Sequence, residues 1–317
     1  AAKWGTHIEG VPVMAVAEAM ERYPDGVFVA TAAHDAGVEI YQQLVEMDCH
    51  GALRYRDLRT LYPQTLFPSQ EPAALEWMAL HRAELMDVGE RLADRESRRE
   101  FHGQVLWRLS FDFDVLPNPR PIEDLYFPAF IRHLEEEVFL DGGAYDGDTT
   151  REFLKRWPAF GCVWACEPDM DNFRALLSWK LGLPPDVQDR IHARPWALTM
   201  RRGLVNFCPR GTMSSSVLPS GTALVSAMPI DRMTVPTYIK LDVEGEEMAA
   251  LRGAVETIRK ARPVLAVCAY HGAADLWEVP EFLFSVCENY RLYLRRYGEE
   301  DIDLVYYAVP EERVLGA

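Results

Sequence analysis

The sequence has no run of apolar residues long enough to cross a lipid bilayer, which takes about 20 residues. Residues 1–30 also lack the succession of charged, apolar and small residues that marks a cleavable secretion signal. Neither a membrane anchor nor a secretion route is indicated. We therefore expect a cytoplasmic protein that does not bind membranes.

Positive charge is also scarce. With 33 lysines and arginines against 49 acidic residues, the net charge is −16 at pH 7, which argues against nucleic acid as a partner. Two short basic pairs, Arg201–Arg202 and Arg295–Arg296, interrupt this pattern. We expect both pairs to be solvated, at a helix end or on the face of a strand.

The six cysteines show none of the paired spacings that metal sites use. Three of them lie in or beside apolar strand candidates, where reduced cysteines pack as small hydrophobic residues. The sequence therefore predicts free thiols at Cys49, Cys162, Cys166, Cys208, Cys268 and Cys287.

At 317 residues, the chain is long enough for one large domain or two unequal ones. Its first part contains a strand at 27–30 and a helix at 38–47, but the loop between them has only Gly37 and no phosphate cradle. We interpret this segment as structural or as a protein contact, with a second ligand site as the alternative. It also offers a surface through which two copies of the chain could form a homodimer.

A helical lead-in follows, with apolar residues at helical spacing through residues 71–110. The charged run ADRESRRE at 93–100 is most simply a solvated junction between these helices. Three prolines at positions 117, 119 and 121 then break the periodicity. We predict an N-terminal α/β and helical domain at 1–118 and a main domain at 119–317.

Strands and helices alternate from residue 138 onward, which builds an α/β domain around a mainly parallel sheet. The chain ends in two aromatic strands, starting near Tyr290 and Asp303 and joined by an acidic turn. This ending predicts a hairpin with one antiparallel strand. The other expected strands are 138–141, 163–167, 191–195, 238–243 and 264–270.

The most informative segment is FLDGGAYDGDTT at 139–150, an apolar strand that runs into a glycine-rich loop and opens a helix. A doubly wound fold holds a nucleoside in this way. The loop departs from GxGxxG and is acidic, which suits the cationic sulfonium of S-adenosylmethionine (SAM) better than a pyrophosphate. We expect SAM to contact Asp141, Gly142, Gly143, Ala144, Tyr145, Gly147, Asp148 and Thr149.

Two further segments place polar residues at strand ends. Glu167 ends the second strand and is followed by Pro168, and we expect both to contact SAM. Glu167 should accept hydrogen bonds from the ribose; a carboxylate at a helix start is the alternative. IKLDVEGEE at 239–247 puts Asp242 and Glu244 at the end of another strand. The glutamates that follow, Glu246 and Glu247, lie in the first turn of a helix, where we expect a structural role.

Together these segments resemble the FkbM-type methyltransferases over about residues 123–310. The resemblance implies a Rossmann-like class I methyltransferase fold, SAM as methyl donor, and a hydroxyl of a sugar, polyketide or other secondary metabolite as acceptor. One segment departs: LRRY at 294–297 stands where an LRHY-like segment is expected. The matching segments are FLDGGAYDGDTT, EPD at 167–169, ALTMRRGLVNF from Ala197, SSS at 214–216, IKLDVEGEE, LRGA at 251–254 and ARPVLAVCAYH at 261–271.

Methyl transfer to an alcohol requires alignment of donor and acceptor and removal of a proton. We expect His271, which follows the next strand, to be the general base, with Asp242 orienting it or the acceptor and also contacting SAM. A divalent ion held by Asp242, Glu244 and His271 is an alternative. The expected substrate pocket contains Tyr126, Phe127, Glu244, Tyr270 and Trp277, although core packing is equally open for Tyr270 and Trp277.

Two other functions compete with this interpretation. A nicotinamide-dependent oxidoreductase would share the glycine loop and Glu167, but it explains neither IKLDVEGEE nor the terminal hairpin. A non-catalytic scaffold that binds SAM or a partner would explain the extra N-terminal part. The sequence leaves open the small-molecule acceptor, the use of a metal and the oligomeric state.

Overall fold

The structure is a computed structural model that describes residues 4–8, 10–32, 34–62, 72–110, 112–209, 216–217, 220–298 and 302–315. Of the matching segment SSS, Ser214 and Ser215 lie outside these residues. The chain forms two compact units, Ala1–Ser69 with Ser110–Asp114, and Gln70–Leu109 with Val115–Ala317. None of the described helices is both long and apolar enough to cross a membrane.

The division differs from the predicted boundary after residue 118. Residues 70–109, which we had grouped with the N-terminal part, belong to the larger unit. The reason is that helix α6 (Arg82–Arg91) packs against helix α13 (Asp275–Val286), far away in the sequence. Such a contact between distant segments leaves no local pattern in either one.

The smaller unit contains two parallel strands, β3 (Phe28–Ala30) and β4 (Ala52–Arg54), connected through helix α2 (His34–Glu46). Its buried cluster is small, with Ala30 and Leu44 among its members. The predicted strand and helix are present, although the helix begins earlier than expected. The other elements of this part are β1 (His7–Ile8), β2 (Val11–Pro12), α1 (Val16–Arg22), α3 (Tyr55–Leu61) and η1 (Phe113–Val115) at its boundary.

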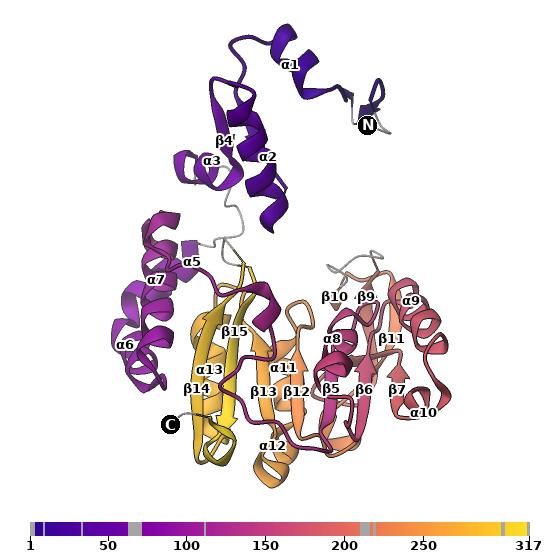
Figure 1. The fold of residues 1–317 in the computed structure, drawn as a ribbon. Helices are drawn as coiled ribbons and strands as arrows, with labels where there is room; N and C mark the ends of the chain where they lie inside the picture. Colours follow the sequence, from indigo (N-terminus) through magenta and orange to yellow (C-terminus); the bar gives the residue numbers. More distant parts are fainter. Residues whose placement is uncertain are drawn as a thin grey trace. The chain divides into compact units, whose positions relative to one another are not determined.

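A seven-stranded sheet in the order β14-β15-β13-β12-β5-β6-β7 forms the centre of the larger unit (Figure 1). Neighbouring strands are parallel except β15, which runs antiparallel to both β13 and β14. The fold is Rossmann-like, as predicted. The strands are β5 (Val138–Gly142), β6 (Cys162–Cys166), β7 (Ile191–Arg194), β12 (Tyr238–Leu241), β13 (Val264–Cys268), β14 (Tyr290–Arg296) and β15 (Leu304–Pro310).

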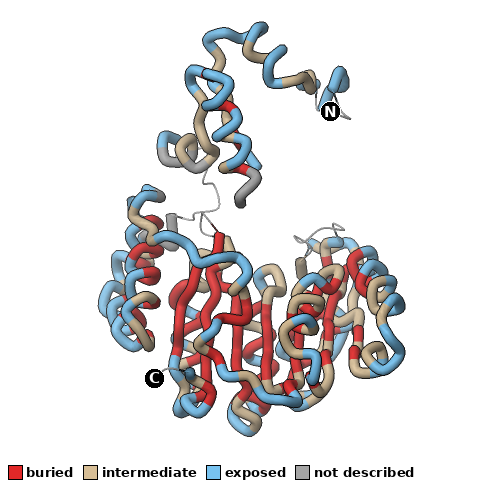
Figure 2. Tube along the Cα trace, in the orientation of Figure 1, coloured by how far each residue is buried: buried red, intermediate tan, exposed pale blue. Residues whose placement is uncertain are grey.

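Helices cover both faces of this sheet (Figure 1), and its strands β12, β13 and β15 are buried at every residue (Figure 2). Successive strand residues point to opposite faces, so Phe139 and Leu140 belong to two separate hydrophobic clusters. The Phe139 side contains residues of α8 (Asp148–Arg156) and α9 (Met170–Leu181), and α10 (Pro185–Gln188) packs there. The Leu140 side contains residues of α6, α11 (Glu247–Arg252), α12 (Val255–Ala261) and α13.

A second, four-stranded sheet has the order β10-β9-β11-β8. We did not predict it, because its strands are short and several of their residues remain exposed. Leu198 in β8 lies against Gly142, so this sheet supports the end of β5. Its elements are β8 (Trp196–Leu198), β9 (Gly203–Cys208), β10 (Ser216–Val217) and β11 (Ala223–Met228), followed by η3 (Ile230–Arg232).

The helical lead-in pairs with the edge strand β14. Asp94 Oδ2 lies 2.6 Å from Arg295 Nη2, and Glu100 Oε1 lies 3.0 Å from Arg296 Nε. The arginines and Glu100 are buried, so the expectation of a solvated strand face at Arg295–Arg296 is wrong, as is that of a fully solvated junction at 93–100. The elements here are α5 (Pro72–Leu80), α6, α7 (Arg95–Ser110) and η2 (Ile122–Asp124), and η4 (Glu311–Arg313) follows β15.

Candidate active site

The glycine loop begins where β5 ends and is shaped by two glycines with positive φ. Gly143 has φ +73°, and a Cβ there would lie 1.8 Å from the carbonyl oxygen of Asp242. Gly147 has φ +90° and precedes α8 directly. Only glycine accepts this backbone conformation and this close approach without strain. The loop after β5 therefore lies directly against the loop after β12.

Asp141 supports this loop from behind. Its carboxylate is fully buried, accepts a hydrogen bond from Thr150 Oγ1 at 2.7 Å and lies 3.2 Å from Lys240 Nζ. Lys240 also donates to the carbonyl oxygen of Gly143 at 2.6 Å. The pair thus ties β5 to β12 beneath the loop. Contact between Asp141 and a donor stays a prediction, and Thr150 is a residue of this network that the sequence analysis missed.

Glu167 follows β6 and faces the glycine loop. Its two carboxylate oxygens accept hydrogen bonds from the backbone N–H groups of Tyr145 at 2.9 Å and Asp169 at 2.8 Å. Burial raises the pKa of Glu167 to about 7, although these two donors act in the opposite direction. Each oxygen keeps a further lone pair for a ligand hydroxyl. Pro168 links Glu167 to Asp169.

The carboxylate at the start of the following helix is that of Asp169, not that of Glu167. Asp169 is the N-cap of α9, and its side chain accepts hydrogen bonds from the N–H groups of Asp171 and Asn172. Because Asp169 satisfies the start of that helix, Glu167 is not needed there. Gly143 and Ala144 both donate to the carbonyl oxygen of Cys166 at 3.0 Å, which fixes the glycine loop next to Glu167.

At the start of α8, Asp148 is exposed and Thr149 is half-buried. The N–H of Thr149 donates to Asp148 Oδ1 at 2.6 Å. Tyr145 has φ +47°, an uncommon conformation for a residue with a side chain. A strained residue therefore lies within the segment that we expect to hold the donor.

Asp242, Glu244 and His271 meet at the carboxyl ends of β12 and β13. His271 Nε2 lies 3.5 Å from Asp242 Oδ1 and 3.6 Å from Glu244 Oε2. Asp242 also accepts hydrogen bonds from the hydroxyls of Tyr126 at 2.8 Å and Tyr270 at 3.2 Å. The structure therefore brings together five residues that the sequence assigned to catalysis or to the substrate pocket.

Glu247 holds the other side of the imidazole. Its Oε1 lies 3.0 Å from His271 Nδ1, and the carboxylate also accepts the backbone N–H groups of Val243 and Gly245. We expected Glu247 to be structural, and it is a buried positioning residue that contacts a predicted catalytic one. The signal in the sequence was weak, since an acidic residue in the first turn of a helix is common.

The charges around His271 set its protonation. Burial acts to lower its pKa, but the carboxylates of Glu247, Asp242 and Glu244 together raise the pKa of His271 to about 9. Burial raises the pKa of Glu244 to about 7. Although burial also acts on Asp242, Lys240 and His271 hold the pKa of Asp242 below its usual value. The imidazole of His271 is therefore held in its protonated, positively charged form by the surrounding carboxylates.

Tyr126 reaches this cluster in a constrained conformation. It has φ +65°, its backbone N–H donates a hydrogen bond to the hydroxyl oxygen of Tyr307 at 3.0 Å, and its carbonyl oxygen accepts one from the hydroxyl of Tyr238. Glu244 also has a positive φ, of +54°. Strained residues held by their surroundings are typical of functional sites.

The other two predicted pocket residues lie in the core. Phe127 is 3% exposed and packs among Phe139, Phe153 and other rings. Trp277 is 4% exposed and stacks on Trp77 at 4.2 Å between ring centres. For Trp277 the alternative of core packing therefore holds, and Phe127 is likewise a core residue.

The sequence and the fold were compared with those of known proteins. The model of the methyltransferase FkbM domain matches residues 141–300. The crystal structure of methyltransferase FkbM from Methylobacillus flagellatus KT has a TM-score of 0.75 and 22% identity, and the match covers 94% of this chain and 78% of that chain. The covered share exceeds the larger unit, so the likeness in fold extends into the smaller one.

Two other solved structures are more distant. Precorrin-6y C5,15-methyltransferase from Geobacter metallireducens GS-15 has a TM-score of 0.37 and 14% identity, over 61% of this chain and 94% of that chain. The fibrillarin pre-rRNA processing protein of Methanococcus jannaschii has a TM-score of 0.37 and 12% identity, over 57% and 70%. No curated protein matches the sequence.

Proposed function

Since the chain belongs to the FkbM methyltransferase family, we propose that it transfers the methyl group of SAM to a hydroxyl oxygen of a small molecule. The acceptor class that we propose is a sugar, a polyketide or another secondary metabolite. A cytoplasmic location stays a prediction from the sequence.

The observation that carries the proposal is the placement of the donor loop beside the Asp242 cluster. Gly143 lies against the backbone of Asp242, and Glu167 faces the loop from β6. In open α/β sheets, ligands bind at the carboxyl ends of the strands. A donor held between the glycine loop and Glu167 would therefore lie next to the residues that can handle a proton.

Methyl transfer is an in-line displacement. The acceptor oxygen forms a bond to the methyl carbon, the carbon–sulfur bond breaks, and the sulfur keeps the electron pair and becomes neutral. The hydroxyl proton must also leave, and we propose that His271 Nε2 accepts it while Glu247 holds Nδ1. Because the pKa of His271 is about 9, only about one molecule in a hundred has it neutral at pH 7, so this step should become faster toward pH 9.

A divalent cation held by Asp242, Glu244 and His271 is a second candidate for the proton-handling step. Their ligand atoms all lie within 4.8 Å of one another, and within the described chain His271 Nε2 has no hydrogen-bond partner. Two carboxylates and an imidazole suit ions such as Mg²⁺ and Mn²⁺. When bound, such an ion would polarise the acceptor hydroxyl. Glu247 would still orient the imidazole.

Calorimetry tests the donor. SAM and its demethylated product should bind to the purified chain, NAD should not, and Glu167→Ala should weaken SAM binding by about tenfold or more, as expected for the loss of hydrogen bonds to a charged group. Glu152→Ala, a change on the exposed side of α8, is the matched control. Binding of NAD in place of SAM would support the oxidoreductase alternative and contradict the proposal.

Turnover tests the reaction. Release of demethylated SAM should be measured over a panel of hydroxylated acceptors, with and without a chelator. Activity that resists the chelator and disappears in His271→Ala supports the general base, whereas activity that the chelator removes and Mg²⁺ or Mn²⁺ restores supports the cation. Activity that survives both treatments together would defeat both schemes, and SAM binding without any turnover would favour the scaffold alternative.

A further inference from the structure

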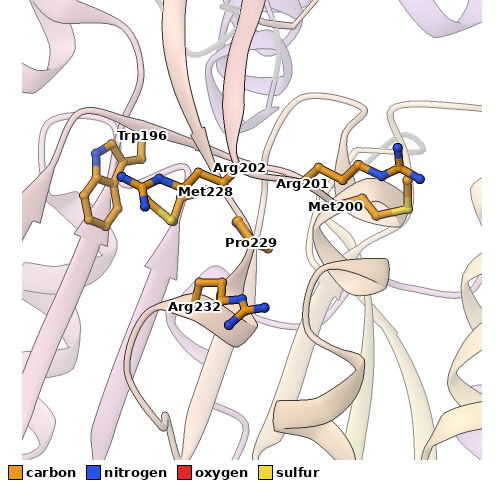
Figure 3. A pocket seen from close by; sticks show the side chains of 7 residues that line it. All are labelled: Trp196, Met200, Arg201, Arg202, Met228, Pro229 and Arg232. Atoms are coloured by element: carbon orange, nitrogen blue, oxygen red, sulfur yellow. The ribbon is translucent and has the colours of Figure 1, made fainter.

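A cavity of about 760 Å³ lies beside the second sheet (Figure 3), and none of the residues assigned above to donor and proton line it. Its lining combines three arginines with an apolar surface. Arg201 and Arg202 come from the turn between β8 and β9, and Arg232 comes from η3. Figure 3 shows Pro229 between Arg202 and Arg232, with Trp196 and Met228 beside them.

The carboxylate that acts on this group of arginines is that of Glu256, which interacts with Arg232 beyond ion-pair distance. In the described part of the chain, none of them forms an ion pair. Asp231, the acidic residue next to Arg232, is occupied by the N–H groups of Glu256 and Thr257 at the start of α12. In a protein with a net charge of −16, three arginines that line one cavity without an ion pair are a departure from the general pattern.

Chemistry narrows the class of ligand. A guanidinium is planar and binds a phosphate through two parallel hydrogen bonds, and several of them around one cavity repel each other until an anion is present. Trp196 adds a flat apolar ring on which a base or sugar can stack. Arg194, whose Cζ lies 5.7 Å from the centre of the Trp196 ring, adds a fourth positive charge nearby.

We propose that this cavity binds a phosphorylated ligand of the nucleoside diphosphate type, with the phosphates on Arg202 and Arg232 and the ring on Trp196; the side chain of Arg201 extends away from Arg202 (Figure 3) and adds positive charge at the rim. The site is independent of the proposed methyl transfer. It is nevertheless connected to the donor loop through β8, because Leu198 lies against Gly142 and the carbonyl oxygen of Thr199 lies against Gly253 at the end of α11.

Calorimetry with defined probes tests the proposal on the full chain, saturated with demethylated SAM so that the donor site is filled. Uridine diphosphate and adenosine diphosphate should bind, uridine should not, and pyrophosphate should bind more weakly than either diphosphate. Arg202→Ala and Arg232→Ala should each weaken binding by about tenfold, as for a lost charged hydrogen bond. Trp196→Leu should weaken the nucleotides but not pyrophosphate.

Two controls separate this site from its alternatives. Arg174→Ala, which removes an exposed arginine of α9, should leave nucleotide binding unchanged and so excludes a general charge effect. Glu167→Ala should weaken SAM but not uridine diphosphate, so that failure of one proposal is distinct from failure of the other. Binding that is absent, or that survives the combined substitution of Arg201, Arg202 and Arg232 by alanine in a chain that melts like the wild type, would overturn the proposal.

Discussion

The buried ion pair of Lys240 and Asp141 should support both the stability of the larger unit and the shape of the donor loop. Lys240 is 2% exposed and Asp141 is fully buried. The change Lys240→Met removes the charge and keeps much of the length of the side chain. It leaves the Asp141 carboxylate with Thr150 as its remaining hydrogen-bond donor, and it removes the hydrogen bond to the carbonyl oxygen of Gly143.

The expected loss can be estimated from these contacts. Removing one member of a buried ion pair costs about 3–5 kcal/mol, because the other charge stays buried, and the hydrogen bond to Gly143 contributes about 1 kcal/mol. Both depend on one nitrogen, so they do not simply add. We expect the free energy of unfolding to fall by about 4 kcal/mol. Adding Asp141→Asn removes the stranded charge and should recover part of this loss.

Urea unfolding of the larger unit measures the loss, and calorimetry with SAM measures the effect on the donor loop, where we expect weaker binding. The matched control is Lys260→Met, which breaks an exposed ion pair with Glu256 at 2.9 Å and should change stability little. If Lys240→Met were as stable as this control, or if Asp141→Asn added a further full loss, the reasoning on the buried pair would be refuted.

Three further predictions concern other parts of the larger unit. Gly143→Ala should abolish SAM binding, because the added Cβ would collide with the backbone of Asp242. The control Gly203→Ala should bind SAM normally, because a Cβ at that position has no neighbouring atom within 4 Å. Normal SAM binding by both variants would contradict the loop geometry. SAM affinity should be constant well above pH 7 and fall below it by about tenfold in all, because the pKa of Glu167 is about 7 and the carboxylate is a stronger acceptor for the ribose hydroxyls than its protonated form. Glu167→Gln should remove this dependence, and a profile equal to that of the wild type would exclude Glu167 as its source. Arg296→Met should lower the free energy of unfolding by about 3–5 kcal/mol, because it leaves the charge of Glu100 buried without its partner. Urea unfolding measures this loss and should show partial recovery when Glu100→Gln is added. No recovery would show that the unpaired buried charge is not the cause.

Much of the site was predictable because its signals are local. Asp242 and His271 follow apolar strands, and the carboxyl ends of neighbouring parallel strands meet at one edge of a sheet. The order of strands and helices is enough to place such residues together. Glu247 was assigned to the right helix turn, but its contact with His271 depends on how the turn after β12 packs against the end of β13.

The sequence could not decide the surroundings of two aromatic residues, Phe127 and Trp277. Aromatic residues such as Phe127 and Trp277 are common both in pocket walls and in hydrophobic cores. Whether such a ring faces a ligand or the core depends on neighbours far away in the sequence. For Trp277 that neighbour is Trp77, in a helix near the start of the larger unit. Nothing in the segment around either tryptophan indicates the other.

The sequence by itself determined the α/β order, the glycine loop and the family, because periodicity, glycine positions and short motifs are properties of contiguous residues. Tertiary structure alone decided which charges are buried. Arg295–Arg296 and Arg201–Arg202 look alike as sequence, yet the first pair is buried against α7 and the second lines an open cavity without a carboxylate. The physical reason is that the energy of a charge depends on its distant partners and on its exposure to water.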